Sequence, residues 1–344
     1  MPSDFGYINA RVRGLKAKLL GDAFYSDALT DSDFPAFLSS LAQTTYSREV
    51  EEAQARYGSD LKTVDEALAR NFYTTTRTLL NVADGLPERL LRVLLLHYDL
   101  GNLKTIARAK SAGRDPEDVQ AGLLPAGELK PAVLEAIAQA SDLPAAAQAV
   151  AVTGHPLGGA FTRAVAAYSS DGDLYELELT LDRAYYDALR QEVAKGGFPA
   201  DFKRYIQREI DVTNVRTALK LRGAGDGGGS TTDAAQAEAL FIKGGKEVGR
   251  ATFDALLSGD TQMLANTSFA AVAETDDLSR AEETLRTSLD RQARQLALRD
   301  PLGVGVVLNY LRLKETETAR LRLLARGKYY GVPRQQLEQE LGYA

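Results

Sequence analysis

The residues of this chain whose types and spacing could do chemistry are acids, amides and bases that recur in three similar segments. These segments are DLGNLKTIARAK at 99–110, DVTNVRTALKLR at 211–222 and ETARLRLLARGK at 317–328. Each begins with an acid, carries Asn or Arg three residues later, and then has two basic residues four positions apart. The candidate site residues are Asp99, Asn102, Lys104, Arg108, Asp211, Asn214, Arg216, Lys220, Glu317, Arg320, Arg322 and Arg326.

The pattern leaves several roles open. On a helix, Asp99 and Asn102 share one face, and the basic pair Lys104 and Arg108 lies on a different face. The acid and the amide could hydrogen-bond within one domain or between domains. A convergence of the three acids would favour carboxylate catalysis, although each acid is followed by basic residues. The basic pairs are typical of a solvated helix end that complements the helix dipole. Alternatively, three equivalent helices present their polar faces to one ring-shaped or axial partner, and on this hypothesis the residues form an interface.

Familiar cofactor, metal and nucleophile motifs are missing or out of context. The chain has no Cys and two His, and neither His97 nor His155 has a second His or a carboxylate at metal-ligand spacing. Glycines 223, 225 and 228 match GxGxxG, but they follow a helical segment where a dinucleotide site needs a strand. Gly244-Gly245-Lys246 is followed by Glu247, so it is not a P-loop. We therefore predict no catalytic residue, no cofactor and no metal site.

Charge and hydropathy narrow the classes of partner. The 344 residues carry a formal net charge of -6, whereas a free-standing nucleic-acid binder is usually basic, so no nucleic-acid partner is expected. Residues 1–20 contain an early Asp and no apolar run, so no signal peptide is predicted. The densest apolar run, Leu90–Leu96, contains Arg92 and is far shorter than the roughly 20 residues of a membrane span. We expect contact with a membrane only through the protein surface or a partner.

Good helix formers dominate the whole chain and predict an all-α fold. A helical run precedes each of the three segments, at 86–99, 199–211 and 301–317, and another precedes each of those, at 65–81, 177–194 and 281–298. Asp300-Pro301 predicts a helix start, with Asp as the N-cap and Pro in the first turn. The stretch GAGDGGGSTT at 223–232 predicts a flexible linker or an exposed loop.

The repeat length predicts small domains. The three segments begin at residues 99, 211 and 317, which are 112 and 106 residues apart. This period is too long for a solenoid repeat and fits three helical domains. We place them at residues 1–114, 115–226 and 227–344.

Motifs spread over the whole chain resemble one known family. They are YINARVR at 7–13, TGHPL at 153–157, DPLGVG at 300–305 and the three repeated segments. Their order, from Asp4 to about Glu340, resembles the C subunit of the A-type and V-type rotary ATPases, the counterpart of the eukaryotic d subunit.

This resemblance implies a funnel of three pseudo-equivalent helical domains with pseudo-three-fold symmetry. It implies a rotor subunit without an active site, present in one copy on the cytoplasmic face of the membrane. Its partners would be the central-stalk subunits and the proteolipid ring, between which it would transmit torque during ATP synthesis or hydrolysis and proton or sodium transport. The alternative is a three-domain helical scaffold of another assembly, which would have the same fold but no affinity for proteolipid rings.

Overall fold

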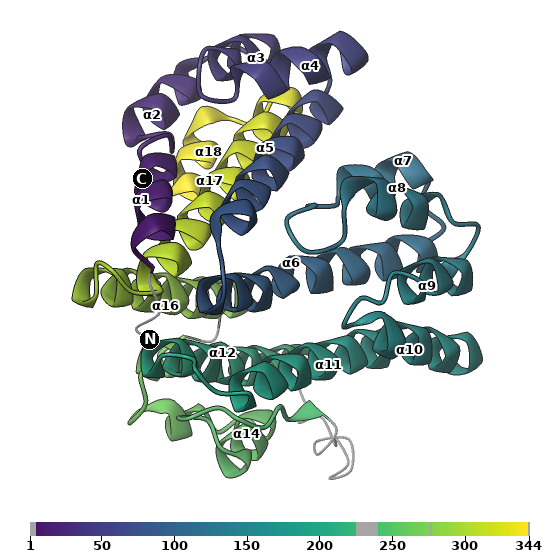
Figure 1. The fold of residues 1–344 in the computed structure, drawn as a ribbon, viewed down its shortest axis with the longest axis vertical. Coiled ribbons are helices and arrows are strands. Elements are labelled where there is room, and N and C mark those ends of the chain that lie inside the picture. The colour runs from purple at the N-terminus through teal and green to yellow at the C-terminus, as the bar shows by residue number, and fades with distance from the viewer. Residues whose placement is uncertain (1–4, 225–239, 276, 343–344) are drawn as a thin grey trace. The chain divides into compact units, whose positions relative to one another are not determined.

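The computed structural model describes residues 5–224, 240–275 and 277–342. Within these ranges every regular element is a helix, so the predicted all-α fold is confirmed (Figure 1). The chain forms two compact units, residues 1–185 with 310–344 and residues 186–309. The predicted loop at 223–232 lies outside the described residues, except that residues 223 and 224 end a helix.

Three pairs of long helices organise the chain. They are α5 Leu61–Val82 with α6 Leu86–Ser111, α11 Leu174–Ala194 with α12 Ala200–Ala224, and α16 Leu278–Arg299 with α17 Gly305–Tyr329. In each pair the second helix joins the predicted helical run and the repeated segment into one continuous helix. The repeated segments are therefore the later parts of α6, α12 and α17, which we call the signature helices.

Short helices precede each long pair in the sequence. Those before the first pair are α1 Gly6–Lys16, α2 Asp22–Thr30, α3 Phe34–Ala42 and α4 Ser47–Tyr57. Those before the second pair are α7 Pro116–Ala121, α8 Pro131–Gln139, α9 Leu143–Ala151 and α10 Gly158–Asp171. Those before the third pair are α14 Arg250–Leu257, the 3-10 helix η1 Thr261–Leu264 and α15 Ala270–Ala273, and α18 Arg334–Leu341 follows it.

The same local bonds start α3, α9 and η1. An Asp at each N-cap accepts a hydrogen bond from a backbone N–H in the first turn, which satisfies a donor that the helix itself leaves unpaired. The pairs are Asp33 with Ala36 N at 2.9 Å, Asp142 with Ala145 N at 2.8 Å and Asp260 with Gln262 N at 3.0 Å.

A threonine turn follows each of these three helices. Its hydroxyl donates to the carbonyl three residues earlier and accepts from the N–H two residues later. The threonines are Thr44, Thr153 and Thr267, and the residues that they fix are Tyr46, His155 and Phe269. The short helices are thus built three times by the same local chemistry.

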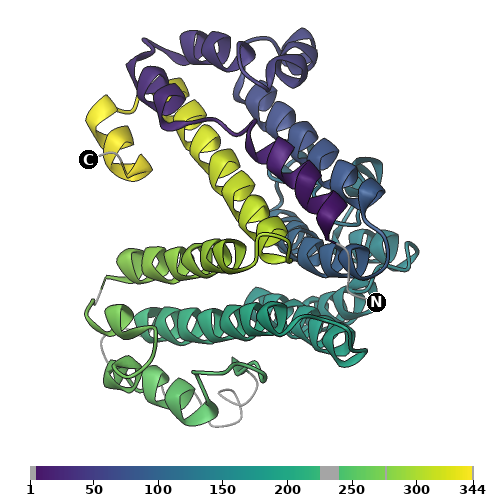
Figure 2. The same ribbon diagram turned by 60° about the vertical axis from the view of Figure 1, so that its left-hand side comes forward.

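In the unit of residues 1–185 and 310–344, one core joins the two ends of the chain. Buried side chains of α2, α3, α4 and α5 pack against Leu321, Leu324 and Ala325 of α17 and against Leu337 and Leu341 of α18. Figure 2 shows α17 and α18 (yellow) beside the N-terminal helices (purple). This packing buries aromatic side chains such as Phe37 and Tyr46 completely, and each removes about 150–250 Å² from water.

In the unit of residues 186–309, α12 packs against both α14 and α16. Phe202, Phe253 and Phe269 are buried there. None of the helices in the described ranges combines the length and the hydropathy needed to cross a membrane.

The predicted helix start at Asp300-Pro301 is wrong. Asp300 is the C-cap of α16, and α17 begins only at Gly305. The Asp300 carboxylate accepts a hydrogen bond from Leu302 N at 3.1 Å, and the Asp300 carbonyl accepts one from Gly303 N at 3.1 Å. The side chain that would cap a helix at this point therefore holds a tight turn, and the helix starts after it.

Candidate functional site

The first signature helix holds the loop that follows it. Asp99 of α6 is fully buried, and its carboxylate accepts hydrogen bonds from Glu128 N at 2.7 Å and Leu129 N at 3.2 Å. His155 Nε2 lies 3.0 Å from the same carboxylate. A buried carboxylate with several donors is a satisfied structural group, because each bond offsets the cost of removing the charge from water.

The second signature helix repeats this arrangement. Asp211 of α12 is buried, and its carboxylate accepts hydrogen bonds from the backbone N–H groups of Lys246, Glu247 and Val248, each at 3.0 Å. Burial raises the pKa of Asp211, and the three backbone bonds act against that rise.

The asparagine three residues after each of these acids holds the same loop from a second point. The Asn102 amide donates to Leu124 O and accepts from Leu124 N, both at 2.8 Å. The Asn214 amide does the same with Ile242, both at 2.9 Å. The amide supplies both a donor and an acceptor, which neither a carboxylate nor a base can do. Of the roles left open by the sequence, the acid and the amide hydrogen-bond to a loop beyond the end of their own helix, across the predicted boundaries after residues 114 and 226 and within one compact unit.

A glycine lies against each carboxylate. A Cβ atom added at Gly127 would collide with the Asp99 carboxylate, and one added at Gly245 would collide with that of Asp211. Glycine is therefore required for the backbone to approach the acid so closely. Lys246 and Glu247, which follow Gly245, present their N–H groups to Asp211.

The third signature helix holds the beginning of the chain. Glu317 of α17 accepts hydrogen bonds from the Tyr46 hydroxyl at 2.6 Å, from Lys314 Nζ at 2.9 Å and from Leu20 N at 2.5 Å. Arg320 replaces the asparagine, and its guanidinium lies 5.5 Å from the centre of the Tyr25 ring. The acid is one methylene longer here and is shared with a buried amine.

Burial also perturbs the groups around Glu317. Burial lowers the pKa of Lys314, while the Glu317 carboxylate raises it in opposition. Burial raises the pKa of Tyr46 well above its ordinary value, and the nearby Glu317 carboxylate adds to that rise. These charges are held inside a core, which is costly unless each has a partner.

The basic pairs form ion pairs with the first helix of the next long pair. Lys104 Nζ of α6 lies 2.6 Å from Asp182 of α11, and Arg108 lies within 2.6 Å of Glu178. Lys220 Nζ of α12 lies 2.8 Å from Glu282 of α16.

The third signature helix, α17, forms its ion pairs with the first long helix, α5. Arg322 and Arg326 of α17 lie 3.2 and 3.4 Å from Asp65 of α5. The second helix of each long pair therefore binds the first helix of the following pair, and the third returns to the first. Burial raises the pKa values of Asp65 and Asp182, and their basic partners lower them.

The two members of a basic pair differ in exposure. The side chains of Lys104 and Arg322 are 18 and 20% exposed, whereas Arg108 and Arg326 are 59 and 49% exposed. Lys220 is also an outer member at 54% exposed, and its pair mate Arg216 is half-buried. Within each pair, only the outer cation is exposed enough to form a direct contact with another protein.

The last basic residue of the first and of the third repeated segment caps a short helix. Lys110 Nζ donates to the carbonyls of Ala138 and Ala140 at the end of α8. Lys328 Nζ donates to Leu29 O at 2.9 Å and Asp31 O at 2.6 Å at the end of α2. A cation at these carbonyls satisfies unpaired acceptors and complements the helix dipole. These residues were not predicted site residues, although they close the repeated sequence pattern.

His155 was not among the predicted site residues either. Its position after Thr153 matches that of Tyr46 after Thr44, and both side chains reach the acid of a signature helix. Aligning the threonine turns would have found it.

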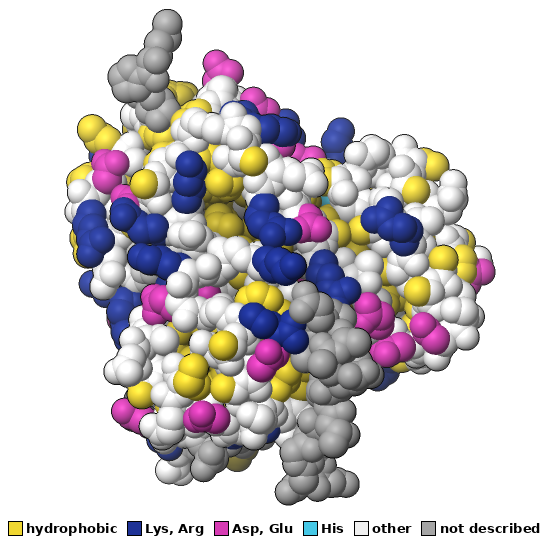
Figure 3. All heavy atoms as spheres, turned by 90° about the horizontal axis from the view of Figure 1, so that it is seen from below, with side chains coloured by type: hydrophobic (Ala, Val, Ile, Leu, Met, Phe, Trp, Pro, Cys, Tyr) yellow, Lys and Arg dark blue, Asp and Glu magenta, His cyan; other side chains and the backbone are white. Residues whose placement is uncertain are grey.

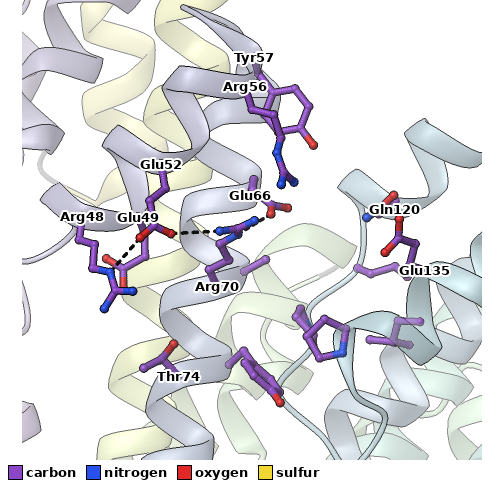
Figure 4. Close-up of a pocket in the computed structure, with 16 residues that line it drawn as sticks. Arg48, Glu49, Glu52, Arg56, Tyr57, Glu66, Arg70, Thr74, Gln120 and Glu135 are labelled. Carbon is purple, nitrogen blue, oxygen red and sulfur yellow. Dashed lines mark hydrogen bonds and ion pairs between the residues drawn. The ribbon is translucent and has the colours of Figure 1, made fainter.

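A polar cleft lies between α4 and α5 on one side and α7 and α8 on the other, with a volume of about 510 Å³ (Figure 4). A chain of ion pairs runs along its wall from Arg48 through Glu52 and Arg70 to Glu66. The Glu52 and Glu66 carboxylates on this wall are therefore held by arginines. In the described part of the chain, no three acid or His side chains gather as metal ligands.

Comparison with known proteins gives a match along nearly the whole chain. The family model described as ATP synthase (C/AC39) subunit matches residues 8–340. The C subunit of the V-type ATP synthase of Deinococcus radiodurans is 40% identical over 99% of this chain and 92% of its own length. That of Thermus thermophilus is 37% identical over 99% of both chains. The C subunit of the A-type ATP synthase of Haloquadratum walsbyi is 27% identical over 97% of both. The chain therefore belongs to the ATP synthase (C/AC39) subunit family.

Proposed function

We propose that this protein is the non-catalytic rotor subunit that links the central stalk to the membrane proteolipid ring of an A/V-type ATPase or ATP synthase. In this role it transmits torque and couples ATP synthesis or hydrolysis to proton or sodium transport. One copy serves each complex, bound peripherally on the cytoplasmic face. The observation that carries the proposal is the match, over nearly the full length of both chains, to relatives named as the C subunits of V-type ATP synthases.

The contacts of the signature helices support a mechanical role. A part that transmits torque must resist deformation, and buried bonds to charged groups resist it better than surface contacts do. Asp99, Asp211 and Glu317 each hold a loop or terminal segment by such bonds. All three acids are thereby occupied, which speaks against a shared catalytic site.

The order of the ion pairs supports a closed arrangement of three repeats. We propose that the domains at 1–114, 115–226 and 227–344 surround a common axis as a funnel with pseudo-three-fold symmetry. The return of α17 to α5 through Arg322 and Asp65 is the contact expected where such a ring closes. A socket on that axis would receive the end of the stalk.

We further propose that the outer cations of the signature helices contribute to the contacts with stalk or ring. Arg108, Lys220 and Arg326 are about half exposed and lie on three equivalent helices. The remaining candidate residues, led by Asp99, Asn102, Asp211 and Asn214, would support the interface from beneath by fixing the helices.

A pull-down tests the proposal. The full chain is the bait, and the prey are the central-stalk subunits and detergent-solubilised proteolipid rings of the same organism. Native mass spectrometry then counts the copies. We expect one copy on each ring, with the stalk joining it. Absence of both partners from a chain with intact helical circular dichroism would contradict the rotor function and leave the scaffold alternative.

Charge reversal separates interface from stability. The variant R108E/K220E/R326E is expected to weaken assembly at least tenfold and to lower the unfolding midpoint only modestly, because water and salt screen the new repulsion from Glu178, Glu282 and Asp65 at these half-exposed positions. The control R56E/K130E/R163E reverses three exposed cations outside the signature helices. Equal assembly of both variants would show that the outer cations do not touch the partners.

A further inference from the structure

Two exposed leucines lie at the turn between α16 and α17. Leu298 is 70% and Leu302 is 64% exposed, which makes them the most exposed leucines in the described ranges. The turn is held by the bonds of Asp300 to Leu302 N and Gly303 N. The leucines therefore project from a turn whose backbone is fixed by these bonds, and an apolar phase that covered them would gain from burying their side chains.

Three arginines of α16 lie near these leucines. Arg291, Arg294 and Leu298 stand at positions i, i+3 and i+7 of α16, so they follow one exposed face of the helix, and Arg299 is adjacent. All three arginines are exposed, and no ion pair joins them to an acid within the part of the chain that the structure describes. The neighbouring Asp300 carboxylate is engaged by Leu302 N. We call these five residues, the two leucines and the three arginines, the turn patch.

Figure 3 shows groups of Lys and Arg side chains interspersed with apolar side chains on one face, although the chain as a whole is acidic with a net charge of -6. The turn patch combines three arginines that lack acidic partners among the described residues with the two most exposed leucines of those residues. Arg286, on the same helix, is instead held by Glu283 at 2.7 Å. Unpaired arginines beside exposed leucines combine attraction to negative charge with attraction to an apolar phase.

The size and chemistry of the turn patch favour a lipid surface over a protein. A stable protein interface buries roughly 800 Å² on each side and is usually centred on aromatic anchors. The turn patch consists of two aliphatic and three cationic side chains and contains no aromatic residue. A bilayer needs no shape complementarity, takes aliphatic side chains between its headgroups, and offers phosphates to arginine.

We propose that the turn patch binds the headgroup region of an anionic bilayer. Leu298 and Leu302 enter the boundary between headgroups and acyl chains, and Arg291, Arg294 and Arg299 contact lipid phosphates. This binding requires neither the stalk nor the proteolipid ring, so it stands or falls separately from the proposed rotor function.

Vesicle flotation of the full chain tests the proposal. The vesicles contain either phosphatidylcholine alone or phosphatidylcholine with about 30% phosphatidylglycerol. We expect binding to the anionic vesicles only, weakening as salt is raised. Each arginine near an anionic surface is worth roughly a fivefold change in partitioning, so R291Q/R294Q/R299Q should reduce it by about 100-fold.

Two further variants distinguish the turn patch from general charge. L298S/L302S should reduce partitioning at least tenfold without altering the net charge, whereas R56Q/K130Q/R163Q removes three exposed cations elsewhere and should reduce it little. Circular dichroism confirms that each variant is folded. The proposal is wrong if the wild-type protein does not bind anionic vesicles, or if R56Q/K130Q/R163Q loses as much binding as the patch variants. It is also wrong if patch variants bind vesicles normally but fail to capture the stalk or ring, because the patch is then a protein-docking surface.

Discussion

The Tyr46 hydroxyl donates a hydrogen bond of 2.6 Å to Glu317, a residue 271 positions later in the chain. Both side chains are buried, and Lys314 Nζ contacts both, at 2.6 Å from the hydroxyl and 2.9 Å from the carboxylate. This cluster joins the N-terminal helices to α17. It does for the third signature helix what His155 does for the first, since each places a polar ring against the acid.

Removing the Tyr46 hydroxyl should weaken the junction between the N-terminal helices and α17. Tyr46→Phe leaves Glu317 and Lys314 buried with one partner fewer, and we expect a loss of about 1–3 kcal/mol in the free energy of unfolding. Urea denaturation measures it. Tyr330→Phe, at a position that is 70% exposed, is the control and should change little. Equal stability of Y46F and wild type would show that the hydroxyl contributes nothing to this junction.

The glycines beside the acids should tolerate no side chain. Gly245→Ala places a Cβ atom against the Asp211 carboxylate and forces the loop away from its three backbone bonds, so we expect a loss of about 2 kcal/mol or more. Gly101→Ala is the control within a signature helix. It meets open space there and should stabilise the protein by about 0.5–1 kcal/mol. Thermal unfolding of both variants checks this, and a neutral G245A would contradict it.

The inner and outer cations of a pair should differ in their contributions to stability. Lys104→Met leaves the largely buried Asp182 without its partner, and we expect a loss of about 1–3 kcal/mol. Arg108→Met removes a pair whose cation is 59% exposed and should cost about 0–1 kcal/mol. Chemical denaturation of the two variants, side by side, measures the difference. A larger loss for R108M would overturn this ranking.

Lys314 should make stability depend on alkaline pH. Its pKa is lowered in the folded protein by burial, so between that lowered pKa and the ordinary value of 10.5 the unfolded chain holds more protons than the folded one. Stability from this group therefore rises as pH rises through that window. Lys314→Met removes the titrating amine.

The measurement is the stability of wild type and K314M from pH 7 to 10. The difference between them should change with pH in favour of wild type, while Lys130→Met, at an exposed position, should track wild type throughout. A pH-independent difference between wild type and K314M would mean that the amine has the same pKa in both states.

The sequence by itself determined the helical class, the long paired helices, the threefold recurrence of an acid and a basic pair, and the asparagine that accompanies the first two acids. These features are local, because helix formers, caps and repeated spacing act within a few turns of the chain. The helical runs before the repeated segments were predicted with their order correct, and the resemblance found in the sequence agrees with the family match over residues 8–340. The start of α17 was predicted wrongly because Asp300 can cap a helix or hold a turn, and the following Leu302 and Gly303 decide between them.

Only the tertiary structure decided what the recurring residues do. Whether Asp99 met solvent, a partner or a loop depended on the approach of Glu128 and Leu129, which spacing does not reveal. The bond of Glu317 to Tyr46 depends on packing across 271 residues, and no local rule encodes such a contact. Burial then distinguished Lys104 from Arg108, two cations that look equivalent in sequence. Removing one partner of a buried ion pair costs more free energy than removing one partner of an exposed pair.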